Sequence, residues 1–452
     1  MTQDISIRVP ILARVEGEGA LELDIEQGQI HNLKLRIYEP PRFFEQLLVG
    51  RPYQEVMDVV ARICGICPVA YQMSAAQALE QIFALQISPW THAMRRLFYC
   101  GEWLESHGLH IHLLAAPDFL GFDSAPAMAQ RYPDELRRGL RLHELGNDLV
   151  SLFGGRAVHP VGACVGGFYR APAQADADAL LTRLRAIEAD AAALVTWTAT
   201  LPLTDLTSDF VSVALSHPDE YAITTGRLRS SDGLDLPIAD YNLHFQESQV
   251  AHSSALHSHL HGNTYLTGPL ARVNLNWAQL PQVVRDNALA TGLTFPSRNM
   301  FHSIVARAIE IHFSVVEAIR LLSDYRPTKT PNLGQTQIGP TLTPTLGPKQ
   351  IPKLAVVPRA GEGFGCTEAP RGILWHHYRT DAEGRIVFAR IVPPTSQNQA
   401  RIEEDLRTSL IRFGLDQPAD ELRLFSEKVI RNYDPCISCA THFLDLRLNR
   451  RG

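Results

Sequence analysis

The chain has 452 residues, of which 45% are apolar, and this is enough for a large buried core. Its net charge of −6 and the lack of a basic tract argue against nucleic acid or an anionic membrane as a partner. No apolar run reaches about 18 residues, so no membrane span is expected. The opening residues show neither a basic segment followed by an apolar stretch nor a twin arginine. We therefore expect a cytoplasmic protein, although a subunit can also be exported on a partner's signal.

The first predicted elements are two strands joined by a turn. Apolar residues alternate with polar ones over residues 21–25 and again over 33–37, with the polar stretch EQGQIHN between them. Helical periodicity follows over 52–63 and 69–86, on both sides of a first Cys-x-x-C pair. A Ser-Pro start then predicts a long helix with an apolar face over 88–114.

The rest of the chain is also mainly helical in its periodicity. Residues 180–194 and 301–322 have long apolar faces and are predicted to be core helices of a bundle. Repeated prolines interrupt residues 326–352, which are expected to be a covering or functional segment. The stretch RIVFARIV is predicted to be a late hairpin strand. We predict one α+β domain over 1–452, mostly α, with a large helical bundle core and small peripheral antiparallel sheets.

The chain contains seven cysteines, an odd and sparse set that is a poor disulfide framework. Four of them form two Cys-x-x-C pairs, Cys64 with Cys67 and Cys436 with Cys439. The others are expected to be small, buried apolar side chains. These isolated residues are Cys100, Cys164 and Cys366.

The two pairs supply four thiolates, and a structural zinc site is one alternative. Zinc ribbons usually place the second pair about 15–20 residues after the first, whereas these pairs lie near opposite ends of the chain. Two separate redox-active pairs are another alternative, but the strand-rich setting of a thioredoxin-like pair is not evident. Sulfur ligands from both ends of a chain suit a soft or borderline metal buried in a large fold. The spacing alone leaves zinc, an iron–sulfur cluster and a rarer centre open.

The residues that flank the cysteines resemble the paired motifs of the nickel–iron hydrogenase large subunit. These motifs are RICGIC at 62–67 and DPCISCATH at 434–442. Further segments match the same family: ARVEGEG at 13–19, PRFFEQLLVGR at 41–51, GGRAVHPVGACVGGF at 154–168, GPLAR at 268–272 and TEAPRG at 367–372. The ordered set covers nearly the whole chain, so the resemblance implies the fold of that subunit.

The resemblance implies that the four cysteines hold one nickel and one iron, and that the iron also carries carbon monoxide and cyanide. Cys64 and Cys436 would bind nickel terminally, and Cys67 and Cys439 would bridge the two metals. The implied reaction is reversible, heterolytic cleavage of H2 to protons and electrons. Cys436 would accept the proton, or Arg371 in an alternative view.

The resemblance also implies a set of charged residues around the metals. A buried anionic cluster needs positive charge nearby, and Arg371 would face the open coordination position while Arg62 supports the same pocket. Asp118 and Asp434 would hold Arg371 through ion pairs. Glu16 would be the first carboxylate of the proton relay, because a carboxyl group both accepts and releases protons. Its neighbour Glu18 is read as a solvated strand residue.

Four more residues receive roles from the same resemblance. The stretch VPPTSQNQ departs from the family pattern, because Pro394 cannot donate a hydrogen bond to a cyanide, and Thr395 would do so instead. His159 would hold neighbouring residues in place. Glu45 and His442 would bind a structural magnesium ion, although histidine is an unusual ligand for so hard an ion. The histidines of SHGLHIH, residues 106–112, are expected to pack or form hydrogen bonds rather than bind metal.

The expected partners follow from what the chain lacks. It has no Gly-x-Gly-x-x-Gly fingerprint, and the subfamily most similar to it is the cytoplasmic, multisubunit, NAD(P)-linked hydrogenases. Pyridine nucleotide would therefore bind diaphorase-type, flavin-containing partner subunits. An iron–sulfur small subunit would take the electrons, since no cysteines remain for an electron-transfer chain. A maturation chaperone and a C-terminal protease are also expected, and residues 443–452 would be either removed after His442 or retained.

Other functional classes stay open at this point. One is a hydrogen sensor with the same cofactor and a signalling partner. Another is a non-catalytic scaffold related to the quinone-side subunit of respiratory complex I, or a zinc-stabilised structural protein. The intact cysteine pairs, together with Arg371 and Glu16, argue against the scaffold. These residues do not separate a sensor from an enzyme.

Overall fold

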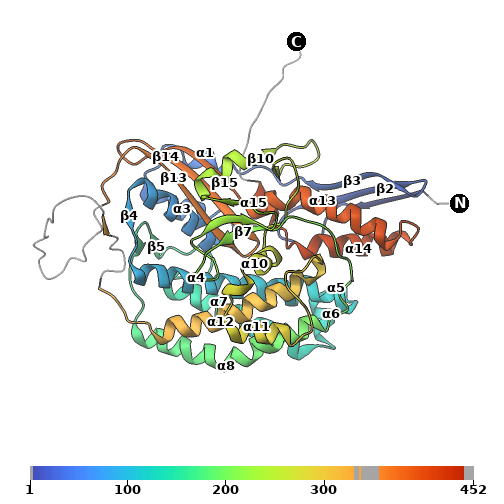
Figure 1. Cartoon of the computed structure of the whole chain (residues 1–452), viewed down its shortest axis with the longest axis horizontal. Helices are drawn as coiled ribbons and strands as arrows, with labels where there is room; N and C mark the ends of the chain where they lie inside the picture. The colour runs from blue at the N-terminus through green and yellow to red at the C-terminus, as the bar shows by residue number, and fades with distance from the viewer. Residues whose placement is uncertain (1–3, 330–334, 337–355, 442–452) are drawn as a thin grey trace, which may run out of the picture.

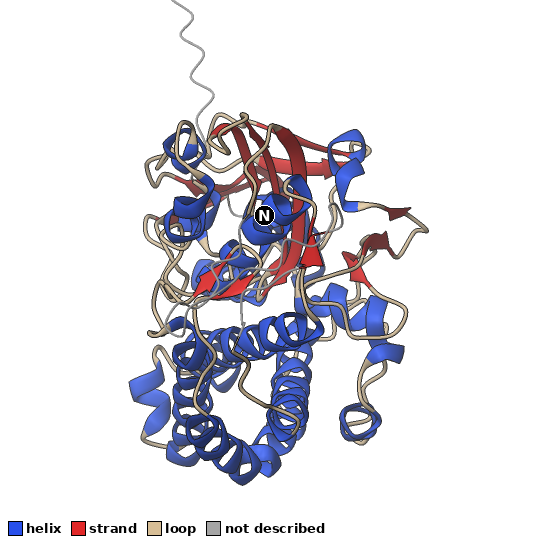
Figure 2. Cartoon of the chain, turned by 90° about the vertical axis from the view of Figure 1, so that its left-hand side faces the viewer, coloured by secondary structure: helices blue, strands red, loops and turns tan. Residues whose placement is uncertain are grey.

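The computed structural model describes residues 4–329, 335–336 and 356–441. Long helices form one layer, and small sheets with the C-terminal helices lie on the other side of the molecule (Figure 1). Figure 2 shows several of these helices nearly end-on below the strands. The long helices of the first layer are α4 (Pro89–Leu109), α7 (Pro133–Gly154), α8 (Gln174–Ala199) and α12 (Ser303–Ser323).

The helical layer forms where the sequence predicts it. α4 begins at Pro89 because Ser88 caps it, with Ser88 Oγ accepting a hydrogen bond of 3.1 Å from the Thr91 N–H. α8 buries the apolar face formed by residues 180–194. α12 packs against both α4 and α8, so most of its residues are buried. The two predicted core helices and the bundle are therefore confirmed.

Shorter helices connect this layer to the rest of the molecule. A π-helical turn, His110–Ala115, continues α4 directly, and short 3-10 turns occupy Ile238–Asp240, Trp277–Gln279 and Met300–His302. The remaining helices are α1 (Phe44–Leu48), α2 (Tyr53–Val60), α3 (Pro68–Ile82), α5 (Ala116–Leu120), α6 (Ala125–Ala129), α9 (Tyr241–His244), α10 (Pro269–Asn276), α11 (Gln282–Leu289), α13 (Pro394–Phe413), α14 (Ala419–Asn432) and α15 (Ile437–Ala440).

The strands form small antiparallel sheets. In each three-stranded sheet, the strands lie side by side in the same order as in the sequence. The three-stranded sheets are β1 (Ile5–Val9) to β2 (Gly19–Glu26) to β3 (Gln29–Ile37), β7 (Val213–Ser216) to β8 (Arg227–Ser230) to β9 (Asp235–Leu236), and β13 (Gly361–Ala369) to β14 (Gly372–Thr380) to β15 (Ile386–Val392). The two-stranded sheets are β4 (Leu85–Gln86) with β12 (Gln335–Thr336), β5 (Ala163–Cys164) with β6 (Gly167–Phe168), and β10 (Phe245–Ser248) with β11 (His257–Leu260).

One of these sheets lies deeper than the expected peripheral position. β13 packs directly on α3, and β14 is buried along nearly all of its length. Two glycines of β13 allow the close approach, because a Cβ on Gly365 would lie 1.9 Å from the Ser74 carbonyl oxygen and one on Gly363 would lie 2.2 Å from that of Ala78. The contact places the start of α3 beside the turn between β13 and β14, where Arg371 lies.

The C-terminal helices bring the last cysteine pair into the molecule. α13 packs on β3 and on α14, and α14 packs on β1. α14 ends at Asn432, and the backbone then reverses at Asp434, which has a left-handed φ of 52°. α15 follows after Pro435 and Cys436, and both Cys436 and Cys439, which lies within α15, are buried.

Several sequence predictions of local structure are confirmed. The early hairpin is β2 and β3, and RIVFARIV contains β15. The isolated cysteines 100, 164 and 366 are buried thiols. Most of the proline-rich segment 326–352 lies outside the described residues. Among the helices that are described, none is long and apolar enough to cross a membrane.

Candidate metal centre

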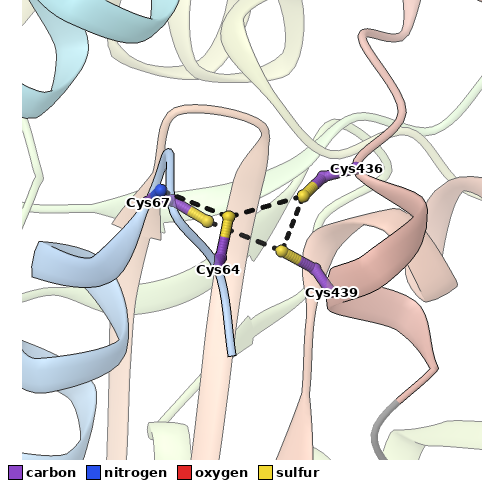
Figure 3. A group of neighbouring side chains, drawn as sticks. All are labelled: Cys64, Cys67, Cys436 and Cys439. Atoms are coloured by element: carbon purple, nitrogen blue, oxygen red, sulfur yellow. Dashed lines mark hydrogen bonds between the residues drawn. The ribbon is translucent and has the colours of Figure 1, made fainter. Parts of the chain in front are cut away.

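Four cysteine thiols from the two ends of the chain meet at one buried point (Figure 3). The Cys64 and Cys436 sulfur atoms are 3.5 Å apart, those of Cys67 and Cys439 are 3.6 Å apart, and those of Cys436 and Cys439 are 2.7 Å apart. All four sulfurs lie within 4.8 Å of one another. The two Cys-x-x-C pairs are therefore halves of one site.

The first half of the site, residues 61–70, is shaped mainly by its own backbone. The N–H groups of Ile66 and Cys67 both donate to Cys64 Sγ at 3.3 Å, which closes the turn between the two cysteines. α3 then begins at Pro68, and the buried Glu102 carboxylate accepts hydrogen bonds from the N–H groups of its first turn, the shortest of 2.6 Å. This carboxylate satisfies helix donors that have no partner within the helix.

The second half, residues 434–441, is held by side chains from distant segments. Glu16 Oε2 accepts hydrogen bonds of 3.1 Å from both Cys436 Sγ and the Ser438 N–H, and its carbonyl accepts one of 3.0 Å from the N–H of Ile437. Thr395 Oγ1 accepts a hydrogen bond of 3.0 Å from the Cys436 N–H. The β-bridge between Glu16 and Cys436 fixes the same contact through the backbone.

Arg42 connects the two halves. One terminal nitrogen, Nη2, donates to the Ile63 carbonyl at 2.7 Å and also to the Ser438 carbonyl. Its backbone N–H donates to the Thr441 carbonyl at 2.7 Å. Arg42 lies within the matched segment PRFFEQLLVGR, but its role could not be predicted from the motif alone. Its position between Pro41 and two phenylalanines in a matched segment was the signal that could have identified it.

Arg371 and Asp434 form a buried ion pair beside the thiols. Arg371 is 2% exposed, its Nη2 lies 3.0 Å from Asp434 Oδ1, and its Nε donates to the Asp434 carbonyl at 2.6 Å. Burial alone would lower the pKa of Arg371, but the charges of Asp434 and the cysteines raise it well above its usual value. Burial would raise the pKa of Asp434, yet Arg371 and other nearby cations lower it. Both side chains are therefore ionised at neutral pH.

The donor set fits a nickel–iron group. Hydrogen bonding, first of all with Cys436, lowers the pKa of Cys64 well below its usual value, whereas burial raises the pKa of Cys436. Burial therefore favours the neutral thiol at Cys436, and four thiolates at this point would need more positive charge than Arg371 supplies, which soft or borderline metal cations provide. Arg371 Nη1 and Asp434 Oδ2 are buried and have no hydrogen-bond partner among the described residues. A guanidinium donor without a partner suits an anionic ligand on a metal.

The structure places two predicted neighbours of Arg371 away from its guanidinium. Asp118, on α5, pairs with Arg14 and, at 2.6 Å, with Arg431. It therefore supports the segment before Glu16 and the end of α14 rather than Arg371 itself. Arg62 is exposed, because it lies on the outer side of the turn that follows α2, so it does not line the buried pocket.

The other predicted residues lie near the centre or outside the described chain. His159, half-buried with a φ of 50°, has Nδ1 2.6 Å from the carbonyl oxygen of Ala61, three residues before Cys64. Glu45 Oε1 accepts a 2.7 Å hydrogen bond from the Ile391 N–H. Burial raises the pKa of Glu45 to about 8. His442 lies outside the described residues, as does the tail 443–452.

The three histidines of residues 106–112 do not gather around one point. In the part of the chain that the structure describes, they are not among the side-chain groups that could hold a metal ion. Their separate hydrogen-bond partners are the Glu310 carboxylate for His107, the Arg431 carbonyl for His110 and the Gly108 carbonyl for His112. Each of the three rings therefore forms a hydrogen bond, as the sequence predicts.

Comparisons with known proteins agree with this site. The sequence matches the nickel-dependent hydrogenase family over residues 42–140 and 239–442. The sulfhydrogenase 1 subunit alpha of Pyrococcus furiosus is 31% identical, and the match covers 98% of this chain and 99% of that protein. The NAD-reducing hydrogenase HoxS subunit beta of Cupriavidus necator is 28% identical, and the match covers 96% of this chain and 94% of that protein. A solved structure of an NAD+-reducing [NiFe]-hydrogenase in the H2-reduced state matches with a TM-score of 0.83 and 27% sequence identity. The match covers 97% of this chain and 99% of that chain.

The chain belongs to the nickel-dependent hydrogenase family. It is a large, catalytic subunit, an oxidoreductase that acts on H2, and its four clustered cysteines fit the nickel–iron centre of that family.

Proposed function

We propose that this subunit cleaves H2 reversibly at the four-cysteine centre and that the proton leaves through Glu16. The observation that carries the proposal is the hydrogen bond of 3.1 Å between Cys436 Sγ and Glu16 Oε2. It joins a thiol of the metal centre to a carboxylate that is only half-buried. A proton on Cys436 therefore has an acceptor within hydrogen-bond reach, which is the geometric requirement for a relay.

Cys64, Cys67, Cys436 and Cys439 would hold nickel and iron, with Cys67 and Cys439 shared between the two ions. The bound group would supply a Lewis acid for H2 and, on its iron, carbon monoxide and cyanide ligands. Two side chains can donate hydrogen bonds toward such ligands. The Thr395 hydroxyl accepts from the Cys436 N–H and so keeps its own proton to donate. Arg371 Nη1 is a buried donor, and Asp434 fixes its guanidinium.

The proton route depends on the difference between two neighbouring glutamates. Glu16 accepts from Cys436 and Ser438, while Glu18 is exposed and lies two residues further along the chain, just before β2. Replacing Glu16 by Gln removes the exchangeable carboxyl but keeps the size and an amide oxygen that can accept from the Ser438 N–H. Glu18→Gln makes the same chemical change outside the site and is the matched control.

The experiment is H2/D+ exchange measured on the purified complex, with nickel and iron content determined on the same samples. Glu16→Gln should keep both metals and lose exchange by about a hundredfold or more, in the range expected for removal of a general acid–base group. Glu18→Gln should behave like the native protein. Exchange that persists unchanged in Glu16→Gln with full metal content would show that the proton leaves by another route.

The proposed electron partner is an iron–sulfur small subunit, and its contact surface would lie beside the first half of the site. Three large apolar side chains in or directly after the matched segment 154–168 are exposed: Val158, Val161 and Tyr169, at 53%, 42% and 55%. The His159 contact with Ala61 ties this surface to the segment that carries Cys64. Arg62, which is also exposed, directly follows Ala61 in the sequence. Exposed apolar groups of this kind favour a protein interface.

Further parts of the proposal rest on relatives and on Glu45. An NAD-reducing relative and an NAD+-reducing structure support electron transfer with NAD(P) through diaphorase-type subunits, and a cytoplasmic location suits that acceptor. A magnesium ion on Glu45 and His442 would offset the burial that raises the pKa of Glu45 to about 8. We also infer that the chain acts as one domain and that a maturation chaperone and a protease, which removes residues 443–452, prepare it.

A further inference from the structure

A second group of metal-ligating side chains lies apart from the four cysteines. His252 is in the loop after β10, His257 begins β11, and Glu403 is on α13. One ligand atom from each lies within 4.8 Å of the other two. His252 Nε2 is 2.8 Å from Glu403 Oε1. The proposed hydrogenase chemistry does not use these residues, although they lie within the span of the family match.

His257 is the unexplained member of this group. Its side chain is buried, the residue being 5% exposed, and its Nε2 has no hydrogen-bond partner among the residues described. A buried polar atom without a partner is unfavourable and calls for an explanation. Burial, with the charges of His252 and His259 as smaller influences, lowers the pKa of His257 to about 4. The ring is therefore neutral at neutral pH, which is the form that binds metal ions.

The other two side chains are oriented toward the same point. The rings of His252 and His257 meet edge to face, with centroids 5.8 Å apart. Glu403 Oε1 also accepts a 2.8 Å hydrogen bond from the Leu35 N–H, so the backbone of β3 fixes the carboxylate. The side chains of His252 and Glu403 keep 20% and 19% exposure. Solvent can therefore reach the point where the three groups converge.

The loop that carries His252 is held in one shape. Ser253 Oγ donates to the Ala255 carbonyl at 3.0 Å and accepts from the Ala255 N–H at 3.1 Å. Ser254 donates from its N–H to the Ile37 carbonyl at 2.7 Å and from its hydroxyl to the Glu39 carbonyl at 2.8 Å. The loop that carries His252 is thus fixed by hydrogen bonds of its neighbours Ser253 and Ser254. Such preorganisation favours ion binding.

A simple ion pair between His252 and Glu403 accounts for two of the three residues. It leaves the buried His257 Nε2 without a partner. Two imidazoles and one carboxylate are the ligand types of zinc sites that keep a fourth position for water. We propose that His252, His257 and Glu403 bind a divalent transition-metal ion, with Zn2+ as the expected species and water as its remaining ligand.

The ion would join three elements, two of which also support the nickel–iron centre. It would tie the start of β11 to α13, and through Glu403 to β3. β3 leads to Glu39, which accepts a 3.1 Å hydrogen bond from the Ser438 hydroxyl between the last two cysteines. α13 contains Thr395 in its first turn. The role of the ion is therefore structural, and the proposal does not depend on the hydrogenase mechanism.

The test measures zinc by mass spectrometry in the purified, nickel-loaded complex, comparing the native chain with Glu403→Gln and His252→Gln. Glu403→Gln keeps the size of the side chain and an acceptor for the Leu35 N–H. The control is the double substitution His244→Gln with His261→Gln, an exposed histidine pair at the end of α9 and directly after β11, with ring nitrogens 2.7 Å apart. The nickel content of each variant reports whether the complex has folded.

The native chain and the control should carry one zinc ion that each test variant loses. In competition with a chromogenic chelator, added Zn2+ should bind the test variants at least about a hundredfold more weakly. Co2+ in place of zinc should give the visible absorption of a four-coordinate site in the native chain, which keeps the test decisive if a variant fails to fold. Absence of zinc and of saturable Zn2+ binding in the native complex would overturn the proposal. Loss of zinc from the control but not from the test variants would also overturn the proposal.

Discussion

The two halves of the cysteine centre are positioned in different ways. In the first half, backbone N–H groups of the Cys64–Cys67 turn contact Cys64 Sγ. In the second half, the backbone and thiol of Cys436 are held by Glu16 and Thr395, which lie far away in the sequence. The turn of the first half is therefore closed by its own backbone, with Glu102, Arg42 and His159 contacting the backbone on either side, whereas in the second half distant side chains contact Cys436 itself. Substitutions at distant positions should act mainly on Cys436 and Cys439.

The largest expected effect is loss of the metal centre, and it should be the same for a ligand removed from either half. Cys64→Ser and Cys436→Ser each remove a thiolate from the group of four sulfurs. Each should lower nickel retention by at least about a hundredfold and abolish H2 oxidation, because a ligand loss should cost at least as much as the loss of an outer hydrogen bond. Metal analysis and hydrogen uptake measure this. Cys366→Ser changes a buried thiol elsewhere and should keep both; nickel retention in Cys64→Ser would contradict the single-site account.

The next effect concerns the charge beside the second half. Arg371→Lys keeps a positive charge but cannot reproduce the two contacts with Asp434, at 2.6 Å and 3.0 Å. Hydrogen oxidation should fall by about 10²–10³-fold, as for the loss of a preorganised donor at a reacting centre, while nickel content stays near normal. Arg401→Lys, at another buried arginine, on α13, is the control and should change the rate far less. An unchanged rate in Arg371→Lys would remove this residue from the site.

Arg42 allows the link between the halves to be tested. Arg42→Met removes hydrogen bonds to the Ile63 and Ser438 carbonyls, each made by a charged donor. The free energy of unfolding should fall by about 2–4 kcal/mol, and nickel should be released to a chelator more readily. Thermal unfolding and timed nickel release measure the change. Arg51→Met, at an exposed arginine of the same segment, should leave both near the native values. Equal behaviour of the two variants would mean that the halves do not need this link.

The smallest effects compare one contact from each half. Thr395→Val leaves the buried Cys436 N–H without its acceptor and should cost about 1–3 kcal/mol. His159→Gln alters a half-buried contact with the Ala61 carbonyl and should cost about 1 kcal/mol or less. Denaturant unfolding, with hydrogen uptake measured in parallel, ranks the two. A larger loss for His159→Gln would reverse the comparison and place the greater sensitivity in the first half.

The sequence predicted what depends on local pattern. Alternation over residues 21–37 gave the hairpin, and apolar periodicity gave α8 and α12. The cysteine pairs could be joined into one site because their flanks match a known family. Glu16 was selected over Glu18 by motif position, and the structure places only Glu16 against Cys436.

The remaining features depend on contacts that no local pattern specifies. Asp118 and Arg62 lie in or near matched segments. Their contacts, however, depend on how α5 and the turn after α2 are oriented in the fold. The depth of β13 follows from its close approach to α3, which Gly363 and Gly365 permit. Arg42 acts through backbone carbonyls, and a carbonyl carries no sequence signal.

The most direct test of the central claim is infrared spectroscopy combined with metal analysis on the purified native complex. The account predicts nickel together with carbon monoxide and cyanide bands in the native complex. Cys64→Ser and Cys436→Ser should each lose the nickel and change or remove those bands together, since both residues serve one site. Zinc in place of nickel, or the absence of these bands from a fully matured complex, would contradict the account.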